Sequence, residues 1–181
     1  LLSMVIGLNG NTVNAIPERP ALALNRDSDW SAYGASNAGT RYAPSDQINT
    51  SNVHKLTKAW EFDTGRIGRF SATPIQIGDG LYLCTAQNVM LALDADTGAE
   101  RWRFDPDNQT PPFGIIGNCR GVTHVALPDA APGTFCAERI VTATTDARMI
   151  AVDKDTGQPC PDIGEEGQIS LLAGMGEVKP Y

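Results

Sequence analysis

The sequence has few of the features that mark helical, zinc-binding or nucleic-acid-binding proteins. No stretch shows a long apolar repeat with the 3.6-residue period of an amphipathic helix, so few helices are expected. The four cysteines include no Cys-x-x-Cys pair and only two histidines are present, which argues against a structural zinc site. The 14 basic residues are scattered among 21 acidic ones. Nucleic-acid binding is not expected, because no basic cluster could neutralise a run of phosphates.

Glycine and proline, by contrast, are plentiful. The 181 residues include 18 Gly and 12 Pro, spread along the whole length. Glycine allows turns with positive φ and proline ends regular elements, so their frequency indicates many short strands. Together with the scarcity of helical patterns, this composition predicts an all-β protein.

The four cysteines are an even number in a strand-rich chain, which fits an oxidising compartment where they pair as disulfides. Three pairings are possible, and the spacing does not choose between them; buried free thiols are the alternative. The residues are Cys84, Cys119, Cys136 and Cys160.

The N-terminal 28 residues differ from the rest in composition and periodicity. Residues 1–8 are apolar but too short to span a bilayer, which takes about 20 residues. They fit the end of a longer hydrophobic segment, the end of a signal sequence, or a frayed apolar terminus. Residues 9–28 are rich in Asn, Pro and Ala without periodicity and are interpreted as a linker. We therefore divide the chain into residues 1–28, tail and linker, and residues 29–181, one incomplete domain.

A repeat runs through this domain. Ala, Asp, Thr and Gly recur in the same order in two copies that begin at Ala92 and Ala151, 59 residues apart. The first copy ends in Trp102, and Cys160 is interpreted as standing where the second copy would have Trp. A third, partial copy starts at Trp60, where an Asp-Thr-Gly turn follows the Trp.

The repeat lies among predicted strands with hairpin turns between them. Strands are expected at residues 74–77, 81–84, 89–93 and 101–104, and again at 139–144 and 149–152. A period near 60 residues with four antiparallel strands per unit indicates the blades of a β-propeller. Closed propellers have 4–8 blades. The chain, with room for about two blades and pieces of a third, is expected to be part of a longer propeller.

Several motifs resemble one family. Residues 29–34, 39–44, 47–49 and 52–56 are similar to the N-terminal segment of the quinoprotein dehydrogenases. Residues 80–85, 118–122, 174–176 and 178–180 are most similar to the membrane-anchored glucose dehydrogenases, with quinate and shikimate dehydrogenases as near relatives. The resemblance covers residues 29–181. It implies the first blades of an eight-bladed propeller that holds pyrroloquinoline quinone (PQQ) near its axis. It also implies that Trp102 docks on the next blade, and that the contact is weaker at Cys160.

The resemblance also implies an activity. The intact protein is expected to oxidise a sugar, glucose or another aldose, to its lactone and to pass the electrons to ubiquinone. Quinate, shikimate or a polyol are alternative substrates, and a non-catalytic periplasmic scaffold is the alternative from another class. The Ca²⁺ ligands and the catalytic Asp of the family lie beyond residue 181. The protein is expected in the periplasm, anchored to the inner membrane by a segment upstream of Leu1.

Three residues are candidates for contact with the quinone. Arg120 matches the family Arg that faces the quinone, where a guanidinium pairs with a carboxylate or a quinone oxygen; a surface Arg in a loop is the alternative. His124 stands one position from the family His, and either lines the pocket from a loop or is structural. Ser71 replaces a family Glu that contacts the cofactor, so either cofactor binding is adjusted or this copy is impaired.

Four repeated carboxylates could suggest a calcium site. They recur with the blade turns and lack the ligand spacing of an EF-hand, so they are interpreted as turn residues. They are Asp94, Asp96, Asp153 and Asp155.

Overall fold

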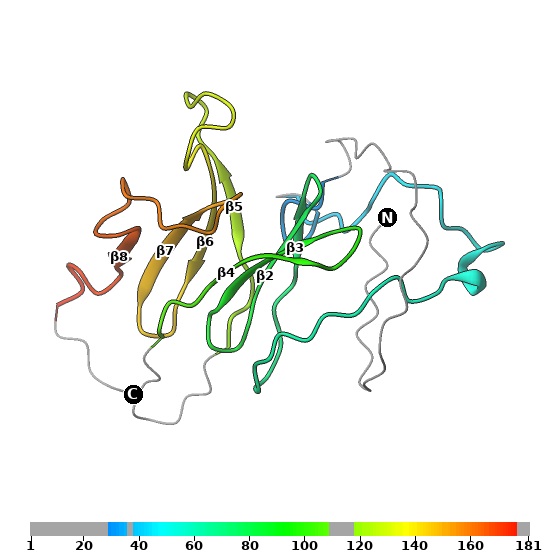
Figure 1. Cartoon of the computed structure of the whole chain (residues 1–181), viewed down its shortest axis with the longest axis horizontal. Helices are drawn as coiled ribbons and strands as arrows, with labels where there is room; N and C mark the ends of the chain where they lie inside the picture. Colours follow the sequence, from blue (N-terminus) through cyan, green and yellow to red (C-terminus); the bar gives the residue numbers. More distant parts are fainter. Residues whose placement is uncertain (1–28, 36–37, 109–117, 177–181) are drawn as a thin grey trace.

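Eight short strands, joined in chain order, form two antiparallel sheets of four (Figure 1). This computed structural model describes residues 29–35, 38–108 and 118–176. The first sheet contains β1 (Ile75–Ile77), β2 (Gly80–Cys84), β3 (Met90–Asp94) and β4 (Glu100–Phe104). The second contains β5 (Thr123–Ala126), β6 (Glu138–Ala143), β7 (Arg148–Asp153) and β8 (Gln168–Ser170). The 3-10 helix η2 (Val53–Lys55) precedes both sheets. The all-β prediction and the two blades are confirmed.

The outer strands of the second sheet, β5 and β8, were not predicted from the sequence. β5 is mostly exposed along its length and therefore lacks the apolar alternation of a half-buried strand. β8 has only three residues, two of them exposed. Both strands exist because β6 and β7, which are largely buried, leave backbone groups that a neighbouring strand can pair.

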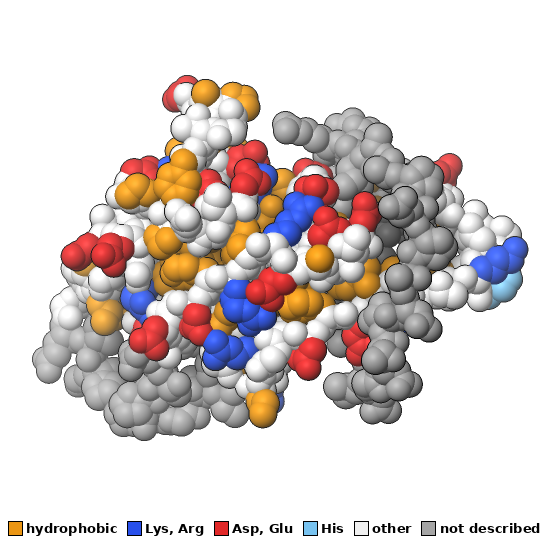
Figure 2. All heavy atoms as spheres, in the orientation of Figure 1, with side chains coloured by type: hydrophobic (Ala, Val, Ile, Leu, Met, Phe, Trp, Pro, Cys, Tyr) orange, Lys and Arg blue, Asp and Glu red, His pale blue; other side chains and the backbone are white. Residues whose placement is uncertain are grey.

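The two sheets lie side by side and share a core (Figure 1). Its buried side chains come from β1, β2, β3 and β4 on one side and from β6 and β7 on the other. Tyr82, Ile140 and Ile150 are at most 2% exposed in this cluster. On the face drawn in Figure 2, basic and acidic side chains adjoin one another, and the ion pairs include Arg101 with Asp79 and Asp94. Within the described ranges, no helix has the length and apolar content needed to cross a bilayer.

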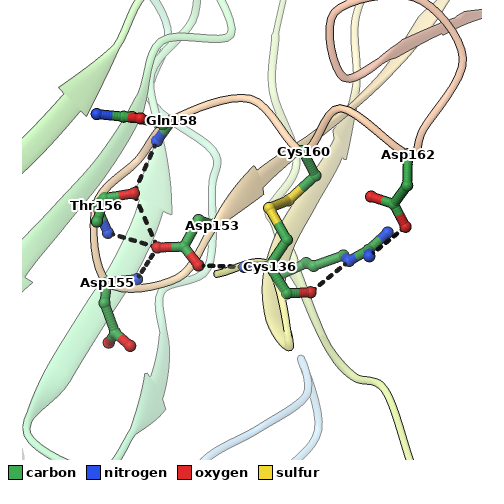
Figure 3. The surroundings of a disulfide bond; sticks show 8 residues. Cys136, Asp153, Asp155, Thr156, Gln158, Cys160 and Asp162 are labelled. Carbon is green, nitrogen blue, oxygen red and sulfur yellow. Dashed lines mark hydrogen bonds and ion pairs between the residues drawn. A yellow bond between two sulfur atoms is a disulfide. The ribbon is translucent and has the colours of Figure 1, made fainter. Parts of the chain in front are cut away.

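Two aspartates hold the β3–β4 turn and the turn that follows β7 in the same way. Asp94 Oδ1 accepts hydrogen bonds from the backbone N–H and the hydroxyl of Thr97, at 2.9 and 2.8 Å. Asp153 Oδ1 accepts the matching pair from Thr156 at the same two distances (Figure 3). A carboxylate that satisfies the donors of its own turn is a structural group, which confirms the interpretation of Asp94 and Asp153 as turn residues.

The tryptophan of each docking contact packs on the glycine of the next turn. The indole N–H of Trp102 donates to the carbonyl of Lys154 at 2.8 Å, and a Cβ on Gly157 would come within 2.6 Å of the Trp102 ring. The docking predicted for Trp102 is confirmed. Trp60 repeats the contact one blade earlier: its N–H donates to the carbonyl of Ala95 at 3.1 Å, and its ring covers Gly98. The partial copy at Trp60 therefore supplies the indole that docks on the first sheet.

Cys160 pairs with Ala151, the residue equivalent to Ala92, but shares this position with Gly167: the N–H of Cys160 donates to the carbonyl of Ala151 at 3.0 Å. In the first sheet Ala92 pairs with Trp102, whereas in the second the N–H of the equivalent Ala151 donates to the carbonyl of Gly167 at 2.9 Å. Residues 161–166 leave the sheet between the bridge at Pro159 and the resumption of pairing at Gly167. The 59-residue offset of the repeat places Pro161, one residue after Cys160, at the position of Trp102, and the chain leaves the sheet there. A repeat offset cannot show such an excursion.

Cys160 also closes a disulfide with Cys136, with the two Cα atoms 5.7 Å apart (Figure 3). The N–H of Cys136 donates to Asp153 Oδ2 at 2.7 Å, and its carbonyl accepts from Arg139 Nε at 2.8 Å. The Arg139 side chain, 6% exposed, also donates to Asp162 Oδ2 at 2.6 Å. The disulfide and the Arg139–Asp162 ion pair therefore anchor the 161–166 excursion to β6 and to the turn at Asp153.

The first described residues join the first sheet. The backbone of Trp30 exchanges two hydrogen bonds of 3.0 Å with Gln76, along the free edge of β1, and Asp29 Oδ1 accepts from the N–H of Gly78 at 2.9 Å. The tail and linker assigned to residues 1–28 lie outside the described residues, as do residues 178–180 of the C-terminal motif.

Candidate functional site

The candidate site lies where the chain enters the first strand of each sheet. Thr73, just before β1, forms a parallel bridge with Gly121, just before β5. The N–H of Thr73 donates to the carbonyl of Arg120 at 3.2 Å. Because each segment leads into a different sheet, a ligand held here would contact both blades.

Arg120 carries the exposed guanidinium of this site. No residue in the described ranges forms an ion pair or a hydrogen bond with its side chain. Several arginines elsewhere are occupied: Arg101 is held by Asp79 and Asp94, and Arg148 by Asp146. The guanidinium of Arg120 is therefore available to an anionic ligand.

Ser71 lies beside the Arg120 segment. Its hydroxyl accepts a hydrogen bond of 2.9 Å from the side-chain Nδ2 of Asn118, two residues before Arg120. Two of the three candidate residues, Ser71 and Arg120, are thus brought together by one hydrogen bond and one backbone bridge. Sequence reasoning missed Asn118, although it stands in the same motif as Arg120.

A disulfide fixes the Arg120 segment to the first sheet. Cys84, the last residue of β2, is bonded to Cys119, and their Cα atoms are 5.9 Å apart. Both residues are at most 4% exposed. On the other side, the hydroxyl of Thr142 in β6 donates to the carbonyl of Gly121 at 3.2 Å. The backbone at Arg120 is therefore held by both blades.

The sequence left open how the cysteines pair. The structure pairs Cys84 with Cys119 and Cys136 with Cys160, and no cysteine is free. The free-thiol alternative is excluded. The sequence held one hint to the Cys84–Cys119 pair, the positions of the two residues: Cys84 ends a predicted strand and Cys119 precedes Arg120.

His124 lies in β5 and not in a loop. Its Nε2 is 2.8 Å from Glu138 Oε2 on the neighbouring strand β6, and its side chain is 15% exposed. No hydrogen bond within the described residues joins His124 to Ser71 or Arg120. A role toward the quinone stays a prediction, and the contact observed is the one with Glu138.

The described residues also contain three buried side-chain atoms without a hydrogen-bond partner: Thr85 Oγ1, Gln87 Oε1 and Asn118 Oδ1. Thr85 and Asn118 are the chain neighbours of Cys84 and Cys119, so they flank the disulfide beside Arg120. In the parts of the chain that the structure describes, no group of three or more His, Cys, Asp or Glu could hold a metal ion.

Comparison with known proteins identifies the fold. Residues 30–181 match the sequence model of the PQQ family described as glucose/ethanol/alcohol dehydrogenase, beta-propeller domain. The chain belongs to this family. Among curated quinoprotein relatives, it is 37% identical to the quinoprotein glucose dehydrogenase of Escherichia coli, over 96% of this chain and 23% of the relative. It is 38% identical to the glycerol dehydrogenase large subunit of Gluconobacter thailandicus, over 89% of this chain and 24% of the relative.

Solved quinoprotein structures agree. The quinohemoprotein alcohol dehydrogenase from Comamonas testosteroni superposes with a TM-score of 0.62 at 27% identity, covering 83% of this chain and 20% of that one. A europium-containing methanol dehydrogenase superposes with a TM-score of 0.59 at 28% identity, covering 72% of this chain and 22% of that one. The chain spans about a quarter of the length of the curated relatives it matches. Two sheets are fewer than a closed propeller requires.

The residues at the site fit the cofactor of the family. PQQ carries three carboxylates and an ortho-quinone, which are acceptors for a guanidinium and for neutral donors. Arg120 supplies a guanidinium that has no partner among the described residues, and Ser71 and Asn118, which adjoin the Arg120 segment, supply a hydroxyl and an amide. The orphaned Asn118 Oδ1 shows that part of this amide still lacks a partner.

Proposed function

We propose that the protein containing this chain is a PQQ-dependent dehydrogenase that oxidises glucose or another aldose to its lactone and passes the electrons to ubiquinone. The family supports PQQ, and the glucose dehydrogenase relatives support the aldose. The observation that carries the proposal is that the guanidinium of Arg120 has no partner among the described residues, while the backbone of its segment is held at the junction of two blades.

Arg120 would bind and orient the cofactor. Its fork of N–H donors matches a carboxylate or a quinone oxygen, and the fixed positive charge would stabilise negative charge that develops on reduction. The disulfide beside it and the Gly121 bridge limit movement of the segment, so little reorganisation is needed at the moment of reaction. When bound, PQQ supplies the two-electron acceptor for the substrate.

Other parts of the machinery would lie outside this chain. The Ca²⁺ ligands and the carboxylate that removes the hydroxyl proton are expected further along the family's chain. Location in the periplasm and anchoring to the inner membrane by an upstream segment are parts of the same proposal. They rest on the resemblance to the membrane-anchored glucose dehydrogenases.

The substrate class has close alternatives. Similar relatives include glycerol dehydrogenase large subunits and a quinate/shikimate dehydrogenase. A polyol or quinate is therefore the runner-up substrate, and dye reduction assayed with aldoses, polyols and quinate separates them.

A non-catalytic propeller scaffold is the second candidate. It is favoured by Ser71, which brings a hydroxyl where the resemblance implies a carboxylate. If the protein is an enzyme, the full-length protein loaded with PQQ and Ca²⁺ should reduce a dye in the presence of an aldose. Absence of both PQQ binding and dye reduction would refute the enzyme and favour the scaffold.

The Arg120→Ala variant tests the site itself. We expect PQQ to bind about 10- to 100-fold more weakly to the full-length variant, because a charge-assisted hydrogen bond is worth about 1.5–3 kcal/mol. Isothermal titration calorimetry measures this affinity. Arg103→Ala, which removes a guanidinium already paired with Glu100 on β4, is the matched control and should bind PQQ normally. Equal affinities of Arg120→Ala and wild type would remove Arg120 from the site.

A further inference from the structure

The buried polar atoms that lack partners are gathered in one place. Thr85 Oγ1, Gln87 Oε1 and Asn118 Oδ1 make up the full set of such side-chain atoms in the described residues. A buried polar group without a hydrogen bond costs about 1–3 kcal/mol, and each one in a folded protein calls for an explanation. Their clustering around the Cys84–Cys119 disulfide points to a shared partner.

A third chain segment closes on the same place. Gln87 Nε2 donates to the carbonyl of Ile67 at 2.8 Å, and a Cβ on Gly68 would lie 2.8 Å from the Cβ of Ala86. The segment before Ser71 therefore packs against the turn after β2. This turn is also tied, through the Cys84–Cys119 disulfide, to the stretch that contains Asn118 and Arg120.

Only one of the two polar atoms of the Asn118 side-chain amide has a hydrogen-bond partner among the described residues. Nδ2 donates to the Ser71 hydroxyl at 2.9 Å, while Oδ1 is buried and has no partner among the described residues. Because a serine hydroxyl can donate as well as accept, the same pair persists if the amide turns over. Either the oxygen or the NH₂ of Asn118 can therefore face a ligand without loss of the bond to Ser71.

We propose that Asn118 is a further cofactor-binding residue: the free half of its amide hydrogen-bonds the quinone beside Arg120, and Ser71 positions that amide. The inference rests on the proposed function. It gives Ser71 a role that needs no charge, since a neutral hydroxyl–amide pair occupies the place where a carboxylate is expected from the resemblance. The cofactor carries three carboxylates, and a neutral pair avoids repelling them.

The test uses the full-length apoprotein and PQQ as the probe. Calorimetry gives the dissociation constant, and a thermal melt with and without PQQ gives the stabilisation on binding. The variants are Asn118→Ala, Asn118→Asp and Ser71→Ala. Gln158→Ala, which removes an exposed amide on the turn that follows β7, is the control.

We expect Asn118→Ala to weaken PQQ binding about tenfold and to leave the melting temperature of the apoprotein unchanged, because one hydrogen bond to an anionic ligand is lost. Asn118→Asp should bind more weakly still, since its carboxylate repels the ligand while it keeps the bond to Ser71. Ser71→Ala should cause a smaller loss, and Gln158→Ala none. If Asn118→Ala does not fold, Asn118→Asp carries the test.

Two outcomes would overturn the inference. Normal PQQ affinity in both Asn118 variants would show that the amide does not touch the cofactor. A lower melting temperature of the apoprotein with unchanged PQQ stabilisation would show that the rest of the protein satisfies the amide. Failure of the wild type to bind PQQ would instead refute the proposed function, so the two failures are distinguishable.

Discussion

One aspartate side chain holds each of the two blade turns, Asp94 in the first sheet and Asp153 in the second, and the protonation of these side chains affects the stability of the fold. Burial alone would raise the pKa of Asp94, but hydrogen bonds from Arg101 and Thr97 outweigh it and lower the pKa to about 2. Burial would also raise the pKa of Asp153, but hydrogen bonds from Cys136 and Thr156 outweigh it, so this pKa is lowered as well. Both carboxylates therefore stabilise the folded protein in their ionised form.

The pH dependence follows from these pKa values. A carboxylate whose folded pKa is below its unfolded value of 3.8 contributes stability that is complete above about pH 4. This contribution is lost as the pH falls through about 2. We expect Asp94→Asn to unfold at lower urea concentration than wild type at pH 7, by about 1 kcal/mol after solvent screening, and the difference to shrink toward pH 2. Asp129→Asn, at an exposed carboxylate with no hydrogen-bond partner in the described ranges, should show no such difference. A gap between Asp94→Asn and wild type that is the same at pH 7 and pH 2 would contradict this account.

At the scale of elements, the two disulfides close loops of similar length but serve different structures. The sequence separations are 35 and 24 residues, so their effects on the unfolded chain differ by only a few tenths of a kcal/mol by loop-closure entropy. One bond joins β2 to the Arg120 segment, and the other joins the residues just before β6 to the start of the excursion after Pro159. Removal of one disulfide therefore serves as the control for removal of the other.

We expect the double variants Cys84→Ser/Cys119→Ser and Cys136→Ser/Cys160→Ser each to lose about 2–4 kcal/mol of stability. Only the first pair should also weaken PQQ binding, because Cys119 adjoins both Asn118 and Arg120. Urea unfolding and calorimetry on the full-length protein measure the two effects. Equal PQQ affinity in the two double variants would show that the Cys84–Cys119 bond does not position the site.

Among the elements, the strands that the sequence predicted correctly are those with continuous runs of buried apolar side chains. β2 and β3 are almost completely buried, β2 follows the turn at Gly78-Asp79 and β3 leads into the turn at Asp94, so their apolar runs identified them. β5 and β8 gave no such signal because their side chains are largely exposed. Their positions follow from the hydrogen-bonding needs of the strands beside them.

At the scale of the whole molecule, blades are joined through tryptophan and glycine. Gly157 has φ +70°, and a Cβ there would be 2.6 Å from the Trp102 ring; Gly78 has φ +57° with nothing within 4 Å. Alanine at either site meets the same left-handed strain, about 1–2 kcal/mol. Only Gly157→Ala also displaces an indole between blades.

We therefore expect Gly157→Ala to destabilise the full-length protein by about 1–3 kcal/mol more than Gly78→Ala, the cost typical of overpacking. Urea unfolding followed by tryptophan fluorescence measures both variants. If they lose the same stability, the indole contact contributes nothing and the strain accounts for the whole effect.

The sequence by itself determined the all-β class, the blade repeat and the Asp-held turns, because each depends on a short pattern that one blade contains completely. The resemblance added PQQ and the docking by Trp102, and it pointed to Arg120 and Ser71. Only the tertiary structure decided the cysteine pairing, the excursion that moves Gly167 into the tryptophan position, and the meeting of Asn118 with Ser71. These features join residues 16 to 47 positions apart through packing within and between the two sheets, and no local pattern records which distant segments that packing brings together.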